Sequence, residues 1–108
     1  MQIELDGLVR LAVIERDKCC VRCGGTKGLQ AAHILPKGKY PRLRFDPFNI
    51  MAMDTGCHLF FWHKDPLSAW KWFEEKYPGK HDQLQVIAAC ATKVDLKLLL
   101  TVWRRGGV

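Results

Sequence analysis

The chain has 108 residues, 48% hydrophobic and 26% charged, which predicts one globular domain and excludes a two-domain mechanism, a disordered chain and a coiled coil. Seventeen Lys and Arg against eleven Asp and Glu leave a net charge of +6. This surplus favours a polyanionic partner, nucleic acid before an anionic membrane surface. No apolar run reaches the ~18 residues of a membrane span, and the start MQIELDG does not resemble an export signal. We therefore expect a cytoplasmic protein without a membrane partner.

Apolar periodicity predicts a chain of helices around one pair of strands. Residues 4–16 repeat apolar side chains at steps of three and four, as an amphipathic helix does. Two short apolar runs, 29–35 and 48–53, predict strands that form a hairpin with a long basic connection. Further helical segments are expected over about 59–63, 66–77, 82–92 and 95–103. The expected fold class is α+β, with one domain over residues 1–108.

Five cysteines in a chain without a recognisable export signal favour reduced thiols, metal ligation or burial over disulfides. Cys20 and Cys23 stand three apart and are followed by Gly24 and Gly25. This is the chemistry of a metal knuckle, because two thiols around a tight turn need residues that tolerate unusual backbone angles. A chain this short has a modest core, so a bound structural metal would add to its stability.

Ligand-type residues then follow in a fixed order along the chain. The order is the pair Cys20 and Cys23, then His33, then Asn49, then Cys57-His58 with His63 beyond. It resembles the cysteine-flanked HNH nuclease family, whose pattern is C-x-x-C, D-H, N and C-x-x-C-H. The corresponding stretches here read Cys20-Val-Arg-Cys23, Ala31-Ala32-His33-Ile34-Leu35-Pro36, Asn49-Ile50-Met51 and Asp54-Thr-Gly-Cys57-His58. The run from His33 to Asn49 is similar to small phage HNH proteins, including the NinG-like recombination endonucleases.

The resemblance implies a ββα-metal (His-Me finger) core at about residues 16–64, with a structural zinc knuckle, flanking helices and a C-terminal helical wrap at about 65–103. It makes His33 the general base, Asn49 the residue that fixes the active-site geometry, and His58 a ligand of a catalytic divalent ion such as Mg, Mn or Ni. An imidazole with a pKa near 6.5 can take a proton from water near neutral pH. A divalent ion held by few protein groups leaves positions open for phosphate oxygens. The implied activity is hydrolysis of DNA phosphodiester bonds, in phage recombination or packaging.

One departure from the family pattern concerns the catalytic ion. Ala32 stands where the family usually has an Asp or His ligand. His63, five residues past His58 and nearly on the same helical face, is the expected replacement, with Asp46 or Asp54 as other candidates.

A second departure concerns the structural zinc, because Asp54 stands where the third zinc cysteine normally falls. Zinc accepts a carboxylate oxygen, so we expect Cys20, Cys23, Asp54 and Cys57 to hold it. Cys19 is an outside substitute for Asp54. Without zinc, the three thiols would pack as small hydrophobic groups.

Basic residues fill the connection between His33 and Asn49. We expect this group to contact the phosphates of DNA without reading a base sequence: Lys37, Lys39, Arg42 and Arg44. The aromatic residues of segments 60–62 and 70–73 are expected to pack in the core rather than to stack on bases.

Two rival functions fit the same residues. One is a zinc-stabilised nucleic-acid-binding module with a decayed catalytic site, which Ala32 favours. The other is an assembly partner, as in phage packaging, whose basic surface contacts another protein. A single copy of the nuclease would nick one strand, and a homodimer would cut both.

Overall fold

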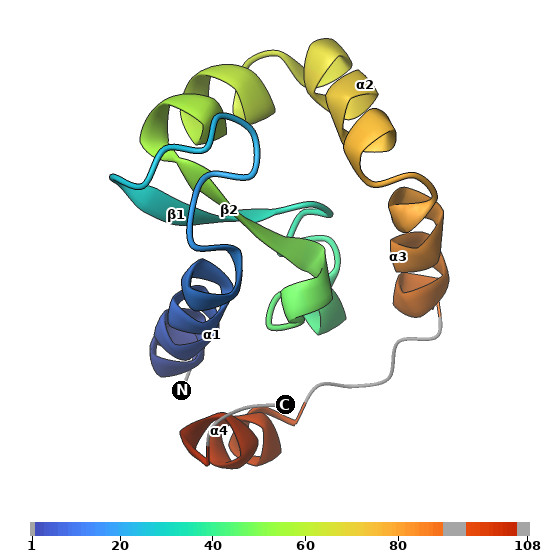
Figure 1. Ribbon diagram of the computed structural model, residues 1–108. Coiled ribbons are helices and arrows are strands. Elements are labelled where there is room, and N and C mark those ends of the chain that lie inside the picture. Colours follow the sequence, from blue (N-terminus) through green and yellow to red (C-terminus); the bar gives the residue numbers. More distant parts are fainter. Residues whose placement is uncertain (1, 90–94, 106–108) are drawn as a thin grey trace.

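A two-stranded antiparallel sheet lies at the centre of the molecule, with helices on both of its sides (Figure 1). The computed structural model describes residues 2–89 and 95–105, apart from the side chain of Arg42. The elements are α1 (Gln2–Asp17), β1 (Leu29–His33), η1 (Pro41–Leu43), η2 (Pro47–Asn49), β2 (Ile50–Asp54), η3 (Cys57–His63), α2 (Pro66–Lys76), α3 (Lys80–Ala89) and α4 (Leu96–Arg104). The α+β class predicted from the sequence is confirmed.

The two strands are shorter than the apolar runs that predict them. Their register runs from Leu29 opposite Asp54 to His33 opposite Ile50. Pro47 begins the 3₁₀ turn η2, where its fixed φ and missing N–H suit a turn better than a strand. Pairing therefore starts only at Ile50, two residues later than the sequence predicts.

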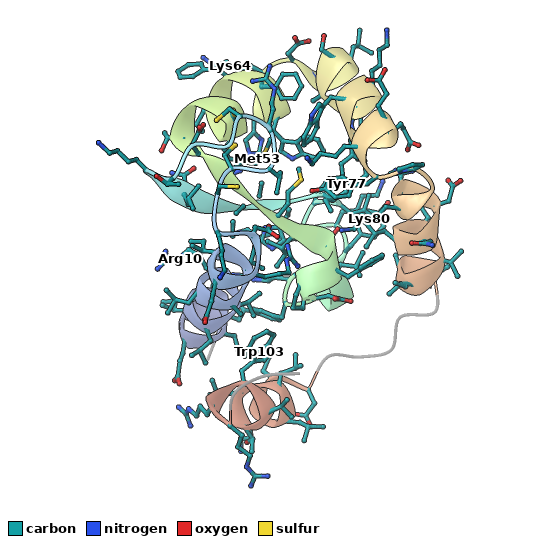
Figure 2. The ribbon with its side chains drawn as sticks, in the orientation of Figure 1. Arg10, Met53, Lys64, Tyr77, Lys80 and Trp103 are labelled. Carbon is teal, nitrogen blue, oxygen red and sulfur yellow. The ribbon has the colours of Figure 1, made fainter. Side chains whose placement is uncertain are left out.

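Each face of the sheet carries its own hydrophobic cluster, because side chains alternate along a strand. On one face, Met51 and Met53 pack with the buried residues of η3, α2 and α3, namely Trp62, Ala69, Phe73 and Leu84. On the other face, Ile50 and Ala52 pack with α1 and α4 through Leu5, Val9, Val13, Leu100 and Trp103. Figure 2 shows Trp103 on the side of α4 that faces α1. The hydrophobic core therefore includes α1, which contributes three buried side chains to it.

The C-terminal helices differ in what they cover. Leu84 of α3 joins the cluster on the η3 face, and Arg104 of α4 pairs with Glu4 of α1 through two hydrogen bonds of 2.7 Å. Residues 90–92, the last part of the helix that the sequence predicts over 82–92, lie outside the described residues. Among the helices of the described ranges, none combines the length and the apolar character that crossing a membrane requires.

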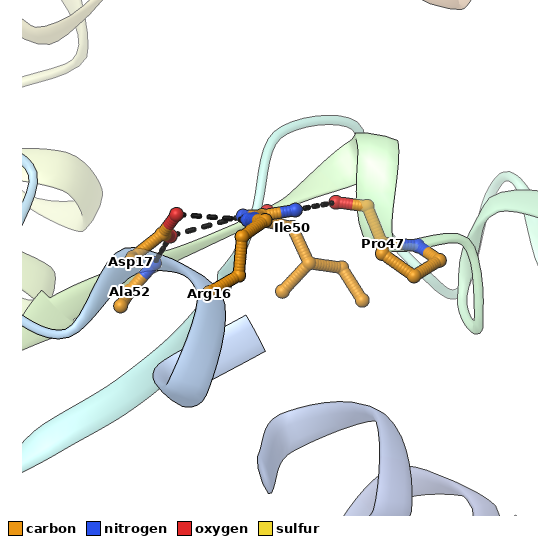
Figure 3. A network of polar contacts seen from close by, with 5 residues as sticks. All are labelled: Arg16, Asp17, Pro47, Ile50 and Ala52. Atoms are coloured by element: carbon orange, nitrogen blue, oxygen red, sulfur yellow. Dashed lines mark hydrogen bonds and ion pairs between the residues drawn. The ribbon is translucent and has the colours of Figure 1, made fainter. Parts of the chain in front are cut away.

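A polar network ties the end of α1 to the start of β2 (Figure 3). The guanidinium of Arg16 donates to the carbonyl oxygens of Pro47 at 2.8 Å and Ile50 at 2.7 Å. The carboxylate of Asp17 accepts from the backbone N–H of Ala52 at 2.9 Å and pairs with Arg16 at 2.8 Å. Burial alone would raise the pKa of Asp17, but the hydrogen bonds from Arg16 and Ala52 outweigh it and lower the pKa.

Asp17→Asn removes the charge from this network and should lower the free energy of unfolding by about 1–2 kcal/mol at pH 7, since hydrogen bonds to charged groups are the stronger ones. Because the pKa of Asp17 is lowered in the fold from its usual 3.8, this stabilisation is present above pH 3.8 and is lost as the pH falls through the folded-state pKa. Urea unfolding at several pH values measures both effects. Glu15→Gln removes an exposed charge from the same helix and should change little; an equal loss in both variants contradicts the assignment.

Candidate active site

Three histidines meet at one open pocket of about 440 Å³. His33 comes from the last position of β1, and His58 and His63 come from η3. Lys37, from the loop that follows β1, lies at the same pocket. The structure thus brings the predicted base, two predicted metal ligands and one predicted phosphate-binding residue to one place.

The ring of His33 is held by the loop between the strands. Its Nε2–H donates to the carbonyl oxygen of Arg44 at 2.9 Å, so in the neutral ring the lone pair is on Nδ1. Arg44 is itself fixed, because its guanidinium forms hydrogen bonds of 3.1 and 2.6 Å to the two carboxylate oxygens of Asp6 in α1. Burial lowers the pKa of His33 from its usual value of 6.5, which keeps the ring neutral and able to accept a proton at pH 7.

The winding of η3 brings His58 and His63 together. Residues five apart in an α-helix point about 140° away from each other, so an α-helix would not give the expected common face for His58 and His63. η3 is a π-helix, whose hydrogen bonds join residues five apart and bring such residues over one another. The Nε2 atoms of the two rings are consequently 2.9 Å apart.

These two rings can present nitrogen ligands to one cation. The Nδ1–H of His58 donates to Oε1 of Gln30 at 2.8 Å, which leaves the lone pair of His58 on Nε2. Two imidazole nitrogens at adjacent positions of an octahedral ion stand about 2.9 Å apart when each bond is about 2.05 Å. Burial lowers the pKa of His58, and the neighbouring histidines lower it further. The neutral form that binds metals is therefore favoured.

The substitutes considered for the ligand missing at Ala32 lie in different places. Ala32 is fully buried in the cluster on the η3 face. The Oδ1 atom of Asp46 accepts from the backbone N–H of Phe48 at 2.9 Å and caps η2. Asp54 belongs to the cysteine cluster. Of the three candidates, His63 lies beside His58.

Asn49 acts on the backbone of the loop rather than at the pocket. Its side chain is fully buried, and its Oδ1 accepts from the N–H of Leu35 at 2.8 Å. Its Nδ2 donates to the carbonyl oxygens of Leu35 at 3.0 Å and Leu43 at 3.2 Å. These bonds close the loop next to Arg44, whose carbonyl holds His33.

A second cluster of ligand-type residues lies at the other end of the hairpin. Cys20, Cys23, Asp54 and Cys57 each offer one atom, and these atoms lie within 4.8 Å of one another. Tetrahedral zinc holds thiolates about 3.8 Å apart at Zn–S distances near 2.3 Å, so the four groups fit one ion after small movements. The thiol of Cys19 is not part of this group.

Asp54 uses its two oxygens differently. Oδ1 accepts from the backbone N–H of Cys57 at 2.7 Å, and Oδ2 accepts from the thiol of Cys23 at 2.6 Å. These bonds lower the pKa of Asp54, and the bond to Asp54 raises the pKa of Cys23 to about 12. A side chain at Gly25 would place its Cβ 3.2 Å from Oδ2 of Asp54, so glycine lets the knuckle close against Asp54.

The four cations of the loop have different environments. Lys37 and Lys39 are exposed, and Lys37 also lies at the histidine pocket. Arg44 is half-buried and already paired with Asp6. The side chain of Arg42 lies outside the described residues. The exposed lysines therefore carry the available positive charge of this loop among the described side chains.

Sequence reasoning missed two residues that orient the histidines. Gln30 is the one polar residue inside the apolar run 29–32, which indicates that its amide has a hydrogen-bond partner. Asp6 interrupts the amphipathic pattern of α1 with an acidic side chain, but its partner Arg44 is 38 positions away. Only the fold brings them together.

In comparisons with protein-family models, curated proteins and solved structures, no match to this chain was found. Its functional assignment therefore depends on the sequence pattern and the geometry described above.

Asn49→Ala should lower the free energy of unfolding by about 2–4 kcal/mol, because it removes the side-chain partners of the buried N–H and C=O of Leu35 and one of the two hydrogen bonds to the carbonyl of Leu43. Urea unfolding followed by circular dichroism measures the loss. Gln83→Ala truncates an exposed amide on α3 and should stay within about 0.5 kcal/mol of the parent. Similar values for the two variants would show that the buried amide does not hold the loop.

Proposed function

We propose that the protein is a metal-dependent endonuclease of the HNH type that hydrolyses phosphodiester bonds in DNA. The observation that carries the proposal is the convergence of three histidines and one lysine on a single open pocket. In this proposal β1, β2 and η3 form a ββα-metal core. The order of residues that resembles HNH nucleases supports the family, and a phage role in recombination or packaging rests on that resemblance alone.

In this proposal, different residues of the chain carry out different parts of the hydrolysis. Nδ1 of His33 accepts the proton of a water molecule while the water oxygen forms a bond to phosphorus. The bond from phosphorus to the leaving oxygen breaks, and that oxygen takes up a proton from solvent. Lys37, which lines the pocket, would contact a phosphate oxygen. The peptide carbonyl of Arg44 keeps the His33 ring oriented throughout.

His58 and His63 would hold the catalytic divalent ion, since the spacing of their Nε2 atoms fits adjacent coordination positions. When bound, such an ion stabilises the charge that develops on the phosphate and the leaving oxygen. In the metal-free arrangement, Nε2–H of His63 donates to Nε2 of His58, so the proton of His63 must move to Nδ1 before both rings can bind. Two nitrogen ligands favour Mn or Ni over Mg.

A structural zinc at Cys20, Cys23, Asp54 and Cys57 is the second part of the proposal. Three thiolates and one carboxylate form a ligand set that zinc accepts. The cluster joins the knuckle after α1 to the start of η3. Zinc bound there would fix η3, and with it His58, against the hairpin.

The rival function, a nucleic-acid-binding module with a decayed site, draws its support from Ala32. This residue is fully buried among apolar side chains, so its position offers no third ligand to the catalytic ion. The rival predicts binding of DNA without turnover. An assembly partner would bind neither DNA nor a catalytic ion. Within the nuclease proposal, a homodimer is needed only if both DNA strands are cut.

The purified chain should bind one zinc ion, and Co²⁺ in its place should give thiolate charge-transfer absorption. Cys23→Ser should abolish this signal, whereas Cys19→Ser should retain it, because Cys19 lies outside the cluster. Zinc displaces the proton of Cys23, whose pKa is raised to about 12, so the apparent affinity should rise with pH. An unchanged signal in Cys23→Ser would contradict this zinc site.

His33→Ala should lower the rate of DNA nicking by about 10²–10⁴-fold, the usual contribution of a general base. Nicking of supercoiled plasmid is measured with Mn²⁺, Ni²⁺ or Mg²⁺ and with chelator. Binding of DNA should change by less than about threefold, since no phosphate contact is removed. Gln83→Ala truncates an exposed side chain outside the pocket and should nick as the parent does.

Equal nicking by His33→Ala and the parent would remove His33 from the mechanism. A parent protein that binds DNA but cuts it with none of these ions would overturn the nuclease proposal in favour of the binding module. A parent that neither binds nor cuts DNA would favour the assembly partner.

A further inference from the structure

Two tryptophans form an aromatic wall of the histidine pocket. Trp62 of η3 and Trp70 of α2 both line it, with ring centroids 5.2 Å apart. The indole N–H of Trp62 donates to the carbonyl oxygen of His33 at 3.1 Å. This bond fixes the aromatic wall directly to the residue proposed as the base.

Core packing buries most of the Trp62 side chain but leaves more of the Trp70 side chain exposed. Trp62 is 9% exposed and belongs to the buried cluster on the η3 face. Trp70 is only partly buried, although it also contacts Phe73 with ring centroids 5.5 Å apart. Part of its indole surface is therefore available to a ligand inside the pocket.

A second hollow of about 270 Å³ adjoins the first, because both are lined by Ala31, His33, Lys37 and His58. Its other residues include Asp6, Arg10, Gln30 and Arg44. Arg10 projects from α1 (Figure 2). The histidines thus stand between an aromatic hollow and a charged hollow.

We propose that the substrate of this site is single-stranded DNA, with one unstacked base held in the aromatic hollow against Trp70. The inference rests on the proposed nuclease function. The scissile phosphate would lie at the histidines and Lys37, and the strand would continue past Arg10 on the charged side. A volume of about 440 Å³ lies within the range of pockets that take small organic groups.

The energetics favour an unpaired strand. Stacking of a base on an aromatic side chain strengthens binding about 5- to 150-fold. A base in a duplex is already paired and stacked, and moving it into a pocket weakens binding by a comparable factor. The gain and the cost nearly cancel for duplex DNA, whereas an unpaired strand keeps the whole gain.

The test uses an oligonucleotide that carries 2-aminopurine, as a single strand and as a duplex, at one fixed salt concentration and without an added catalytic divalent ion. We expect the parent to bind the single strand at least tenfold more tightly than the duplex and to quench the fluorescence of 2-aminopurine. Trp70→Leu should weaken binding of the single strand about tenfold, with little effect on the duplex. Trp70→Phe keeps an aromatic ring and should retain most of the affinity.

Trp72→Leu is the matched control, because Trp72 is partly buried on the same helix and does not line the pocket. It should bind both forms of DNA as the parent does. Equal binding of single strand and duplex by the parent would overturn the inference. An equal loss in Trp70→Leu and Trp72→Leu would overturn it as well.

Cleavage assays with Mn²⁺ separate this inference from the proposed function. If binding of the single strand depends on Trp70 but no ion supports cleavage, the stacking site stands and the nuclease proposal fails. If duplex is cut as fast as single strand by both the parent and Trp70→Leu, the nuclease stands and the inference fails.

Discussion

The buried amide of Asn49 is the contact on which the histidine site depends. A long loop between two strands has many conformations, and its closure carries an entropic cost. The side chain of Asn49, at the end of the loop, offsets this cost with hydrogen bonds to the backbone of Leu35 near its start and of Leu43 within it. The carbonyl that orients His33 belongs to the next residue, Arg44. Closing the loop therefore also sets the direction of the ring.

Among the described residues, η3 links the two candidate metal sites. Cys57 at its first position belongs to the cysteine cluster, and His58 follows immediately at the histidine pocket. The two groups have different chemistry: thiolates and a carboxylate suit a closed structural site, while two imidazoles leave coordination positions free. Because Cys57 and His58 are adjacent in one helix, fixing Cys57 in the cysteine cluster also fixes the position of His58 at the pocket.

The histidine pocket is built from residues that also hold the fold together. Trp62 fills the core and bonds the backbone of His33, and Asp6 joins α1 to the loop through Arg44. The network of Arg16 and Asp17 fixes the other end of α1 on β2. The histidine pocket is therefore supported by η3, by α1 and by the loop between the two strands.

The sequence by itself determined the α+β class, the order of the elements and the identity of the ligand-type residues, because these depend on local periodicity and spacing. It also indicated the cluster that Asp54 forms with three cysteines. The pairing of Asp6 with Arg44, the amide of Gln30 on His58 and the start of β2 at Ile50 required the folded chain. So did the π-helical winding of η3, which alone brings His63 next to His58. These features join residues distant in sequence or depart from regular geometry, and only tertiary packing selects them.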